Sequence, residues 1–288
     1  MGKGLKIASL ALVALLALGG VTMALMPPAD LRPEGLRGPV DAAAEKKGRA
    51  LLARLPEAYG GLERWRAARV TRVWLSDFWP DGIAKTVAYP WRDGESMELT
   101  YQNGQDNARA VFEGSDRAGH AWGIQNWVTY SQAPGGERVF APDDEIKFWP
   151  PTIQYFAELP FRMLEAGVVQ YAGERQLGGE TYDLIYATWN DAEPQERIDQ
   201  YLVWINRQSG RADWVQYTVR DMHKSALGCM HYEDYRQVDG LTFPFRMTAG
   251  GTPEAPETMH RMDVTRVELL PEHPLSELVP EPERKARK

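Results

Sequence analysis

Short strand-like segments separated by turn residues occupy most of the chain, from residue 69 to residue 269. β-Branched and aromatic residues fill these segments, and Asn103-Gly104 is a pair that two-residue hairpin turns prefer. Tyr182, Leu184 and Tyr186 alternate with other residues at a period of two, which is typical of a strand. Because consecutive strands joined by short turns usually pair with each other, the pattern predicts an up-and-down antiparallel sheet.

The spacing of the turn residues predicts roughly nine to eleven strands. We expect them to include Val70–Phe78, Ile83–Tyr89, Met97–Tyr101, Trp122–Tyr130, Tyr182–Tyr186, Tyr201–Ile205, Trp214–Val219, Leu241–Thr248 and Met259–Leu269. Strand twist accumulates across a sheet of this size, so the sheet is expected to curl.

Three segments show helical patterns instead. Asp41 can cap a first helix, and Leu62–Ala67 forms a second, short one. Glu145–Gly167 carries many large apolar residues and is cut by Pro150-Pro151 and Pro160, so we expect two short helices there. Helices placed before and inside a curled sheet would fill its concave side. The predicted fold is therefore mainly β (α+β): a curved antiparallel half-barrel wrapped around short helices, after one N-terminal apolar helix.

The N-terminal apolar run extends from Ile7 to Met26 without a charge, and Lys3 and Lys6 precede it. As a helix it would span about 30 Å, the thickness of a bilayer core. The same residues fit a secretory signal with a cleavage site at Thr22-Met23-Ala24. We favour a retained anchor, because the apolar run continues to Met26. In both interpretations the rest of the chain lies outside the cytoplasm.

These patterns divide the chain into four parts. Residues 1–26 are a membrane anchor or signal peptide, and residues 27–40 are a linker rich in Pro and Gly. Residues 41–272 form the half-barrel domain, and residues 273–288 form a basic tail that contains several prolines.

Charge and cysteine content argue against several classes of function. The formal net charge is −7, and acidic residues outnumber basic ones between residues 55 and 280. Such a body repels phosphate backbones, so we expect no nucleic-acid partner. The single cysteine, Cys229, rules out an intramolecular disulfide and a metal site built from several thiolates.

The strongest polar cluster surrounds Cys229 and His231, with His223, Glu233 and Asp234 nearby. Residues two apart on a strand share a face, which suits a bound metal or a thiol activated by imidazole. A partly exposed sheet face is the other interpretation. We favour it because the sequence identifies no third ligand or orienting group, and no known catalytic or phosphate-binding motif is present. We therefore expect no catalytic residue, metal or cofactor.

Four motifs, in the same order along residues 45–270, resemble the LolA-like superfamily of periplasmic proteins, which includes the outer-membrane lipoprotein carriers. They are Tyr59–Trp65, Gly178–Asp183, Trp204–Gly210 and Tyr232–Pro244, the last containing Val238-Asp239-Gly240-Leu241. The resemblance implies a curved antiparallel sheet around helices that holds acyl chains or other lipid in a cavity. It also implies a location in the bacterial cell envelope. Carriers of this family are soluble once exported, whereas this chain has an apolar N-terminal run.

We therefore expect a non-enzymatic envelope protein that binds a lipid or an acylated protein. It is expected to face the periplasm and to be anchored in the inner membrane by residues 7–26. If the signal is cleaved, the protein is expected to be periplasmic. The apolar cavity and its helical lid are expected to be lined by Phe148, Trp149, Ile153, Tyr155, Phe156, Phe161, Met163, Leu164, Trp122, Trp204 and Trp214. A structural or assembly protein that docks a partner on its sheet is the alternative, and a hydrolase using Cys229 and His231 is the third. An open apolar cavity would favour the first hypothesis, and a filled core would favour docking.

Overall fold

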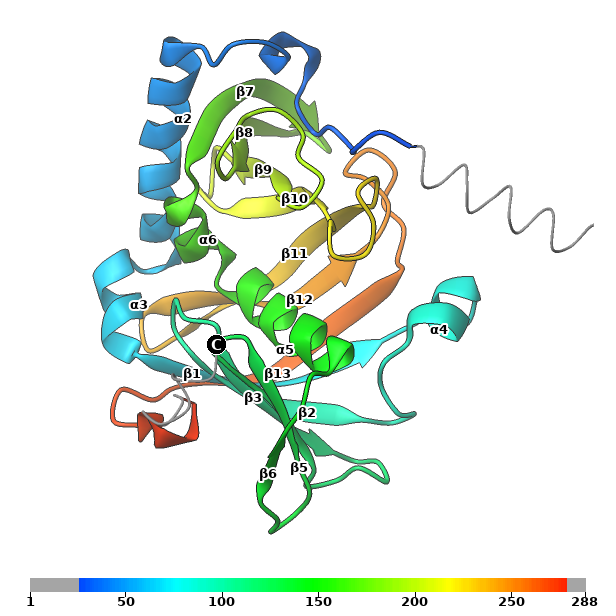
Figure 1. Cartoon of the computed structure of the whole chain (residues 1–288). Helices are drawn as coiled ribbons and strands as arrows, with labels where there is room; N and C mark the ends of the chain where they lie inside the picture. Colours follow the sequence, from blue (N-terminus) through cyan, green and yellow to red (C-terminus); the bar gives the residue numbers. More distant parts are fainter. Residues whose placement is uncertain (1–25, 279–288) are drawn as a thin grey trace, which may run out of the picture.

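The computed structural model describes residues 26–278, which form one open antiparallel sheet of 13 strands with short helices. The strand order is β6-β5-β4-β3-β2-β1-β13-β12-β11-β10-β9-β8-β7, and Figure 1 shows how strongly this sheet curls. The strands are β1 (Val70–Phe78), β2 (Ser96–Gln102), β3 (Asn107–Glu113), β4 (Ala121–Gln125), β5 (Val128–Gln132), β6 (Arg138–Phe140), β7 (Val168–Leu177), β8 (Glu180–Thr188), β9 (Gln200–Asn206), β10 (Ala212–Thr218), β11 (Leu227–Val238), β12 (Leu241–Ala249) and β13 (His260–Leu269).

The helices are short and occur before, inside and after the run of strands. They are η1 (Glu34–Leu36), α2 (Ala42–Arg54), η2 (Leu55–Tyr59), α3 (Leu62–Ala68), α4 (Ile83–Ala88), α5 (Asp144–Ala157), α6 (Leu159–Arg162), η3 (Met163–Glu165) and η4 (Leu275–Glu277).

The strand count of 13 corrects the expected nine to eleven. The segment expected as one strand at Trp122–Tyr130 is two strands, β4 and β5, joined by a tight turn. Asn126 and Trp127 form this turn with positive φ angles of 47° and 65°. Neither residue is a glycine, so the sequence carries no strong turn signal there. Strands β3, β6 and β7 were also not among the expected segments.

The segment expected as a strand at Ile83–Tyr89 is helix α4 instead. Its Ile and Val favour strands locally, but the segment projects from the sheet and has no strand beside it (Figure 1). A helix satisfies its backbone hydrogen bonds within the segment itself, which a lone strand cannot do.

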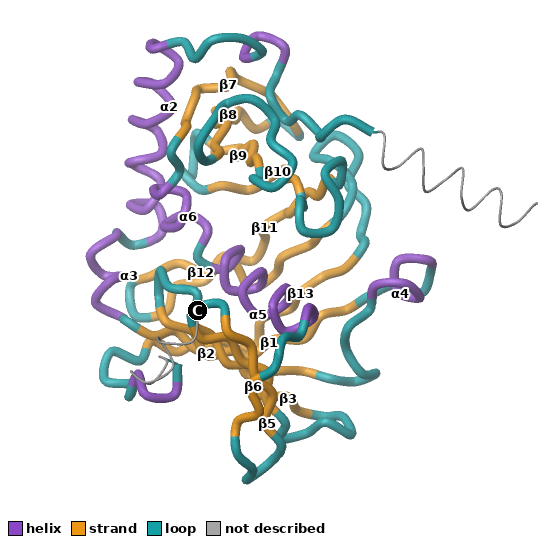
Figure 2. The backbone as a smooth tube through the Cα atoms, in the orientation of Figure 1, coloured by secondary structure: helices purple, strands orange, loops and turns teal. Residues whose placement is uncertain are grey.

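The path of α5 follows from the sheet topology. Its segment connects β6 to β7, which are the two opposite edges of the sheet, so the chain must cross the whole sheet (Figure 2). Asp143 caps α5 by accepting a hydrogen bond from the Ile146 N–H at 3.0 Å. The helix continues through Pro150 and Pro151, contrary to expectation, and ends only at Glu158, before α6.

The sheet has two buried faces. We call the face that packs against α2, α5 and α6 the inner face; it carries the main core, which includes Leu99, Val203 and Val215. The opposite, outer face of β7–β11 carries a smaller cluster that includes Leu184, Trp204 and Cys229.

Helix α2 covers the edge strand β7. The approach is so close that a Cβ on Gly48 would lie 2.7 Å from the backbone of Gln170. Covering an edge strand in this way prevents it from pairing with another chain.

The expected linker at residues 27–40 has one short helix, η1, and its first half is attached to the domain. The Leu31 N–H donates to the Gln200 side chain at 2.9 Å, and Leu36 packs on the outer-face cluster. The Arg32 side chain is 5% exposed and pairs with Glu193 at 2.7 Å. We call residues 26–32 the strap.

The expected anchor or signal at residues 7–26 lies outside the described residues except for Met26. Within residues 26–278, none of the helices has the length and apolar character needed to span a membrane.

Candidate functional site: the helix-covered inner face

The inner face brings together nine of the eleven side chains expected to line an apolar cavity. Five of these side chains come from α5, α6 and η3 and are buried in the main core: Trp149, Ile153, Phe156, Phe161 and Met163. Phe148, Tyr155, Leu164 and Trp122 are half-buried and pack against the same core. The helices and the inner face of the sheet therefore form one continuous apolar contact.

The packing beneath these helices is tight. The Phe161 ring stacks on Trp65 with centroids 4.7 Å apart, and the Phe156 ring lies 4.6 Å from that of Tyr217 on β10. Phe156 is 4% exposed and Met163 is fully buried. The inner face is thus filled by side chains, and an apolar ligand can enter only if α5 and α6 move.

Trp204 and Trp214 do not belong to this group, because the structure places them on the outer face. They are paired across β9 and β10, and their neighbours Val203 and Val215 point to the inner face. All seven residues of β9 are buried, so both faces of the strand are apolar and the sequence period could not tell which residues face α5.

A polar group lies in the aromatic cluster near the start of α5. Asp77 on β1 accepts hydrogen bonds from the indole N–H groups of Trp79 and Trp91, both at 2.8 Å. Its other carboxylate oxygen is 2.8 Å from Nδ1 of His260, and His260 stacks on Trp79. Trp149 of α5 packs edge-on against Trp79, with centroids 6.0 Å apart. Sequence reasoning missed this cluster, since its members are far apart along the chain.

A second polar group anchors the other end of α5 to the turn between β2 and β3. Glu158 is 1% exposed and accepts hydrogen bonds from the Gly104 N–H at 3.1 Å and from Gln154 at 3.0 Å. Arg162 bridges Glu158 to Asp106, at 3.2 Å from each. We call Gln154, Glu158, Arg162 and Asp106 the latch.

Burial dominates the electrostatics of the latch. It raises the pKa of Glu158 from 4.5 to about 7, although the Arg162 guanidinium and the hydrogen bonds act in the opposite direction. The Gln154 side chain also donates to the backbone carbonyls of Gln102 at 3.1 Å and Gln105 at 2.7 Å. The latch therefore joins α5 to the sheet by polar contacts that depend on pH, whereas the rest of the helix is held by apolar contacts.

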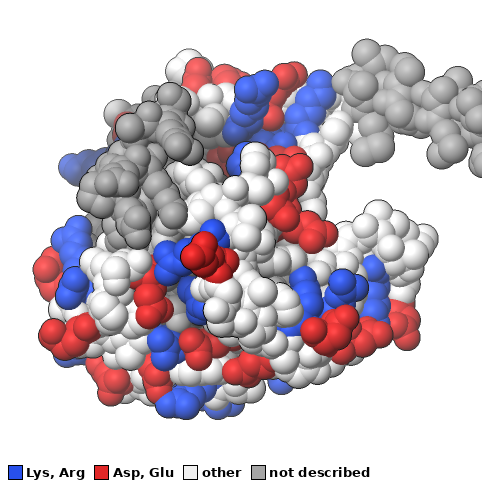
Figure 3. All heavy atoms as spheres, turned by 60° about the horizontal axis from the view of Figure 1, so that its bottom comes forward, with Lys and Arg blue, Asp and Glu red and all other residues white. Residues whose placement is uncertain are grey.

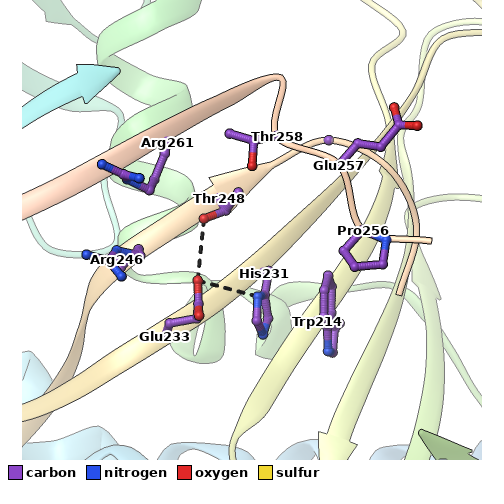
Figure 4. Close-up of a pocket in the computed structure, with 10 residues that line it drawn as sticks. Trp214, His231, Glu233, Arg246, Thr248, Pro256, Glu257, Thr258 and Arg261 are labelled. Atoms are coloured by element: carbon purple, nitrogen blue, oxygen red, sulfur yellow. Dashed lines mark hydrogen bonds and ion pairs between the residues drawn. The ribbon is translucent and has the colours of Figure 1, made fainter. Parts of the chain in front are cut away.

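The outer face carries a shallow polar pocket of about 240 Å³ (Figure 4). Trp214 and His231 stack at its floor with ring centroids 3.7 Å apart, and His231 lies 3.5 Å from Glu233. Arg246, at its side, is paired with Asp263 at 3.0 Å. Arg261 pairs with the same carboxylate at 2.8 Å, so both arginines beside the pocket already have an acidic partner.

The cysteine–histidine strand has no arrangement for nucleophilic chemistry. Cys229 is 1% exposed in the outer-face cluster, and burial raises the pKa of its thiol to about 12. Burial also lowers the pKa of His231. Asp234 points to solvent and pairs with Arg236, and His223 contacts Ser225 at 2.7 Å. Across residues 26–278, His, Cys, Asp and Glu side chains form no group of three that could hold a metal ion.

The fold resembles solved structures at low sequence identity. A DUF1329 family protein from Desulfovibrio piger matches with a TM-score of 0.51 and 11% identity, covering 81% of this chain and 96% of that chain. A LolA superfamily protein from Nitrosomonas europaea matches with a TM-score of 0.51 and 12% identity, covering 81% and 97%. No protein-family model matches the sequence, and no curated protein is detectably similar to it. At such identities the similarity shows the fold alone.

Proposed function

From the LolA-like fold of this chain, we propose that it is a non-enzymatic protein of the bacterial cell envelope that binds acyl chains of a lipid or lipoprotein between α5–α6 and the inner face of the sheet. The sequence resemblance described above supports the same proposal.

The observation that carries the proposal is the cover of the inner face. A sheet with 13 strands presents a large apolar inner face, and between β6 and β7 it is covered by two short helices and not by a second sheet. The cover ends at a polar latch that includes Glu158. Short helices joined by a break can open at a lower free energy than the sheet itself.

Binding would replace side-chain contacts with ligand contacts. Phe148, Tyr155 and Leu164 are only half-buried at the border of the helices, so an acyl chain can begin to enter there. Each buried methylene group contributes about 0.8 kcal/mol, so an acyl chain of ordinary length can offset the separation of α5 from the sheet.

The proposed location follows from the sequence. Residues 1–26 are a membrane anchor or a signal peptide, and the domain from residue 41 to residue 272 faces the periplasm. Residues 27–40, which contain all of the strap except Met26, connect the two. A retained Ile7–Met26 would anchor the chain in the inner membrane.

The filled inner face favours a second candidate, a protein that docks a partner on its sheet without binding lipid. With α5 packed on the sheet, as in this structure, Trp149, Ile153 and Phe156 are buried like ordinary core residues. The two candidates differ in whether α5 separates from the sheet.

Photo-crosslinking distinguishes the candidates. The full chain is mixed with vesicles of a phospholipid that carries a diazirine near the end of one acyl chain, and adducts are mapped by mass spectrometry. Lipid binding predicts adducts on the inner face, around Phe156 and Tyr217. Adducts confined to exposed residues and to residues 1–26 would leave docking as the better function.

A pair of truncations provides the control. Phe156→Ala on the inner face and Leu184→Ala on the outer face both remove a buried apolar side chain. Each should lower the free energy of unfolding by several kcal/mol, in the range of about 2–5 kcal/mol for such changes. Only Phe156→Ala should change the yield of acyl adducts on the inner face.

A further inference from the structure

Seven of the eleven large apolar side chains that are exposed in residues 26–278 lie along one end of the sheet or in the adjoining strap. The loops that join β1 to β2, β12 to β13 and β10 to β11 are neighbours there, because the strand order is β2-β1-β13-β12-β11-β10. We call residues 79–95, 219–226 and 250–259, with the strand ends beside them, the rim. Large apolar residues that are exposed at the rim or in the adjoining strap are Met26, Phe78, Ile83, Val87, Met222, Leu227 and Met259.

Helix α4 is the most prominent part of the rim. Ile83 is 84% exposed and Val87 is 79% exposed, and they lie one turn apart on the same side of the helix. Ala84 and Ala88 pack instead against the main core. This helix therefore presents its larger apolar residues to the outside, the reverse of the usual pattern for a helix on the surface of a soluble domain. Figure 3 shows a largely uncharged lobe at the side where α4 projects in Figure 1.

The strap brings the N-terminal run to the same end of the molecule. The Ala29 N–H donates to the Lys224 carbonyl at 2.9 Å, and the Ser225 hydroxyl contacts the sulfur of Met26 at 3.7 Å, both in the loop between β10 and β11. The ion pair of the buried Arg32 side chain with Glu193 joins the strap to the loop between β8 and β9. Met26, the last residue of the uncharged run Ile7–Met26, therefore lies against the rim.

We propose that the rim rests on the surface of a phospholipid bilayer, with Ile83 and Val87 of α4 inserted among the lipids. The inference goes beyond acyl-chain binding on the inner face and rests on the proposed membrane location of Ile7–Met26. An anchor joined directly to the rim keeps the rim at the bilayer. The rim extends over five strand spacings from β2 to β10, roughly 24 Å at the usual spacing, which is a broad contact.

The charge of the rim indicates how it binds. Acidic residues outnumber basic ones in the three rim loops, so anionic lipids would not attract them. Transfer of apolar side chains out of water is then the driving force. Docking should therefore be as complete on vesicles of phosphatidylcholine as on vesicles that also contain phosphatidylglycerol.

Two single-cysteine labels test the contact in the full chain. Val87→Cys places a fluorophore on α4, and Val128→Cys places one at the opposite end of the sheet, where the side chain is 49% exposed. The native Cys229 is buried, so it will not take up the label. With the protein in phosphatidylcholine vesicles that contain a spin-labelled lipid, the Val87→Cys label should be quenched by the lipid and shielded from iodide. The Val128→Cys label should be quenched by iodide only.

A double variant measures the contribution of α4. Ile83→Ser with Val87→Ser changes two exposed residues, so the fold should persist, and circular dichroism checks this. A label at Met222→Cys then reports docking of the neighbouring loop. The ratio of docked to undocked protein should fall about tenfold for each side chain removed.

Other outcomes overturn the inference. If the full chain stays off the vesicles, both the membrane location and the rim contact are wrong, whereas acyl binding is unaffected. If the chain binds but iodide quenches both labels equally, the rim contact alone is wrong. Shielding of Val87→Cys without quenching by lipid would assign the rim to a protein partner or a second copy of the chain.

Discussion

Replacing Glu158 by glutamine should remove a large part of the pH dependence of stability between pH 4.5 and about 7. Glu158 is 1% exposed, and burial raises its pKa from 4.5 to about 7, so the folded state holds the proton in this window and the unfolded state does not. The preferential protonation of Glu158 in the folded state therefore adds its full contribution to the free energy of unfolding below pH 4.5. This contribution is lost as the pH rises to about 7. At about 1.4 kcal/mol for each pH unit, the loss is about 3 kcal/mol.

Glutamine cannot ionise, so Glu158→Gln should not show this loss. Its carbonyl can accept the bonds from Gln154 and Arg162, but its NH₂ group would face the Gly104 N–H. We expect the variant to be less stable than the wild type at low pH by about 1–3 kcal/mol, the cost of one unsatisfied buried donor. Above pH 7 this difference should shrink or reverse.

Urea titrations followed by tryptophan fluorescence, at the two ends of this pH window, measure the effect. Glu165→Gln is the control, because Glu165 contacts the same guanidinium at 3.6 Å but is 57% exposed. The control should change with pH as the wild type does. Parallel pH profiles for the wild type and Glu158→Gln would refute the reasoning and indicate that Glu158 is ionised throughout.

Three further changes test the packing of the fold. Asp77→Leu should cost about 3–5 kcal/mol, because it leaves two buried indole N–H groups without an acceptor, whereas Asp77→Asn should cost less; thermal melts compare them. Gly48→Ala should lower the melting temperature although alanine favours helices, since its Cβ would lie 2.7 Å from the backbone of Gln170. Gly35→Ala is the control, because no atom lies within 4 Å of the Cβ that it adds, and it should leave the melting temperature unchanged. Cys229, whose pKa is raised to about 12 by burial, should react with a maleimide only after denaturation, and rapid labelling of the folded protein would contradict its placement.

Local pattern was sufficient to predict the mainly β class of fold and most of the strands. Hairpin signals such as Asn103-Gly104 and Asp239-Gly240 fix turns through backbone preference alone, and both lie between paired strands in the structure. The helical character of residues 145–167 was also predicted correctly, because long apolar segments with capping residues determine helices locally.

The face of the sheet on which each side chain lies, and the groups that surround it, were decided only by the tertiary structure. β9 is buried at every position, so its sequence could not assign Trp204 to the outer face. The latch and the Asp77 cluster join residues that are distant along the chain, such as Asp77 and His260, and no local pattern encodes such pairs. Helix α4 differs from its strand propensity because no neighbouring strand is available there to satisfy its backbone. The sequence by itself thus determined periodicity, turns and burial tendency, which are properties of neighbours along the chain. Which groups meet across the sheet depends on the strand order, and this exists only once the chain has folded.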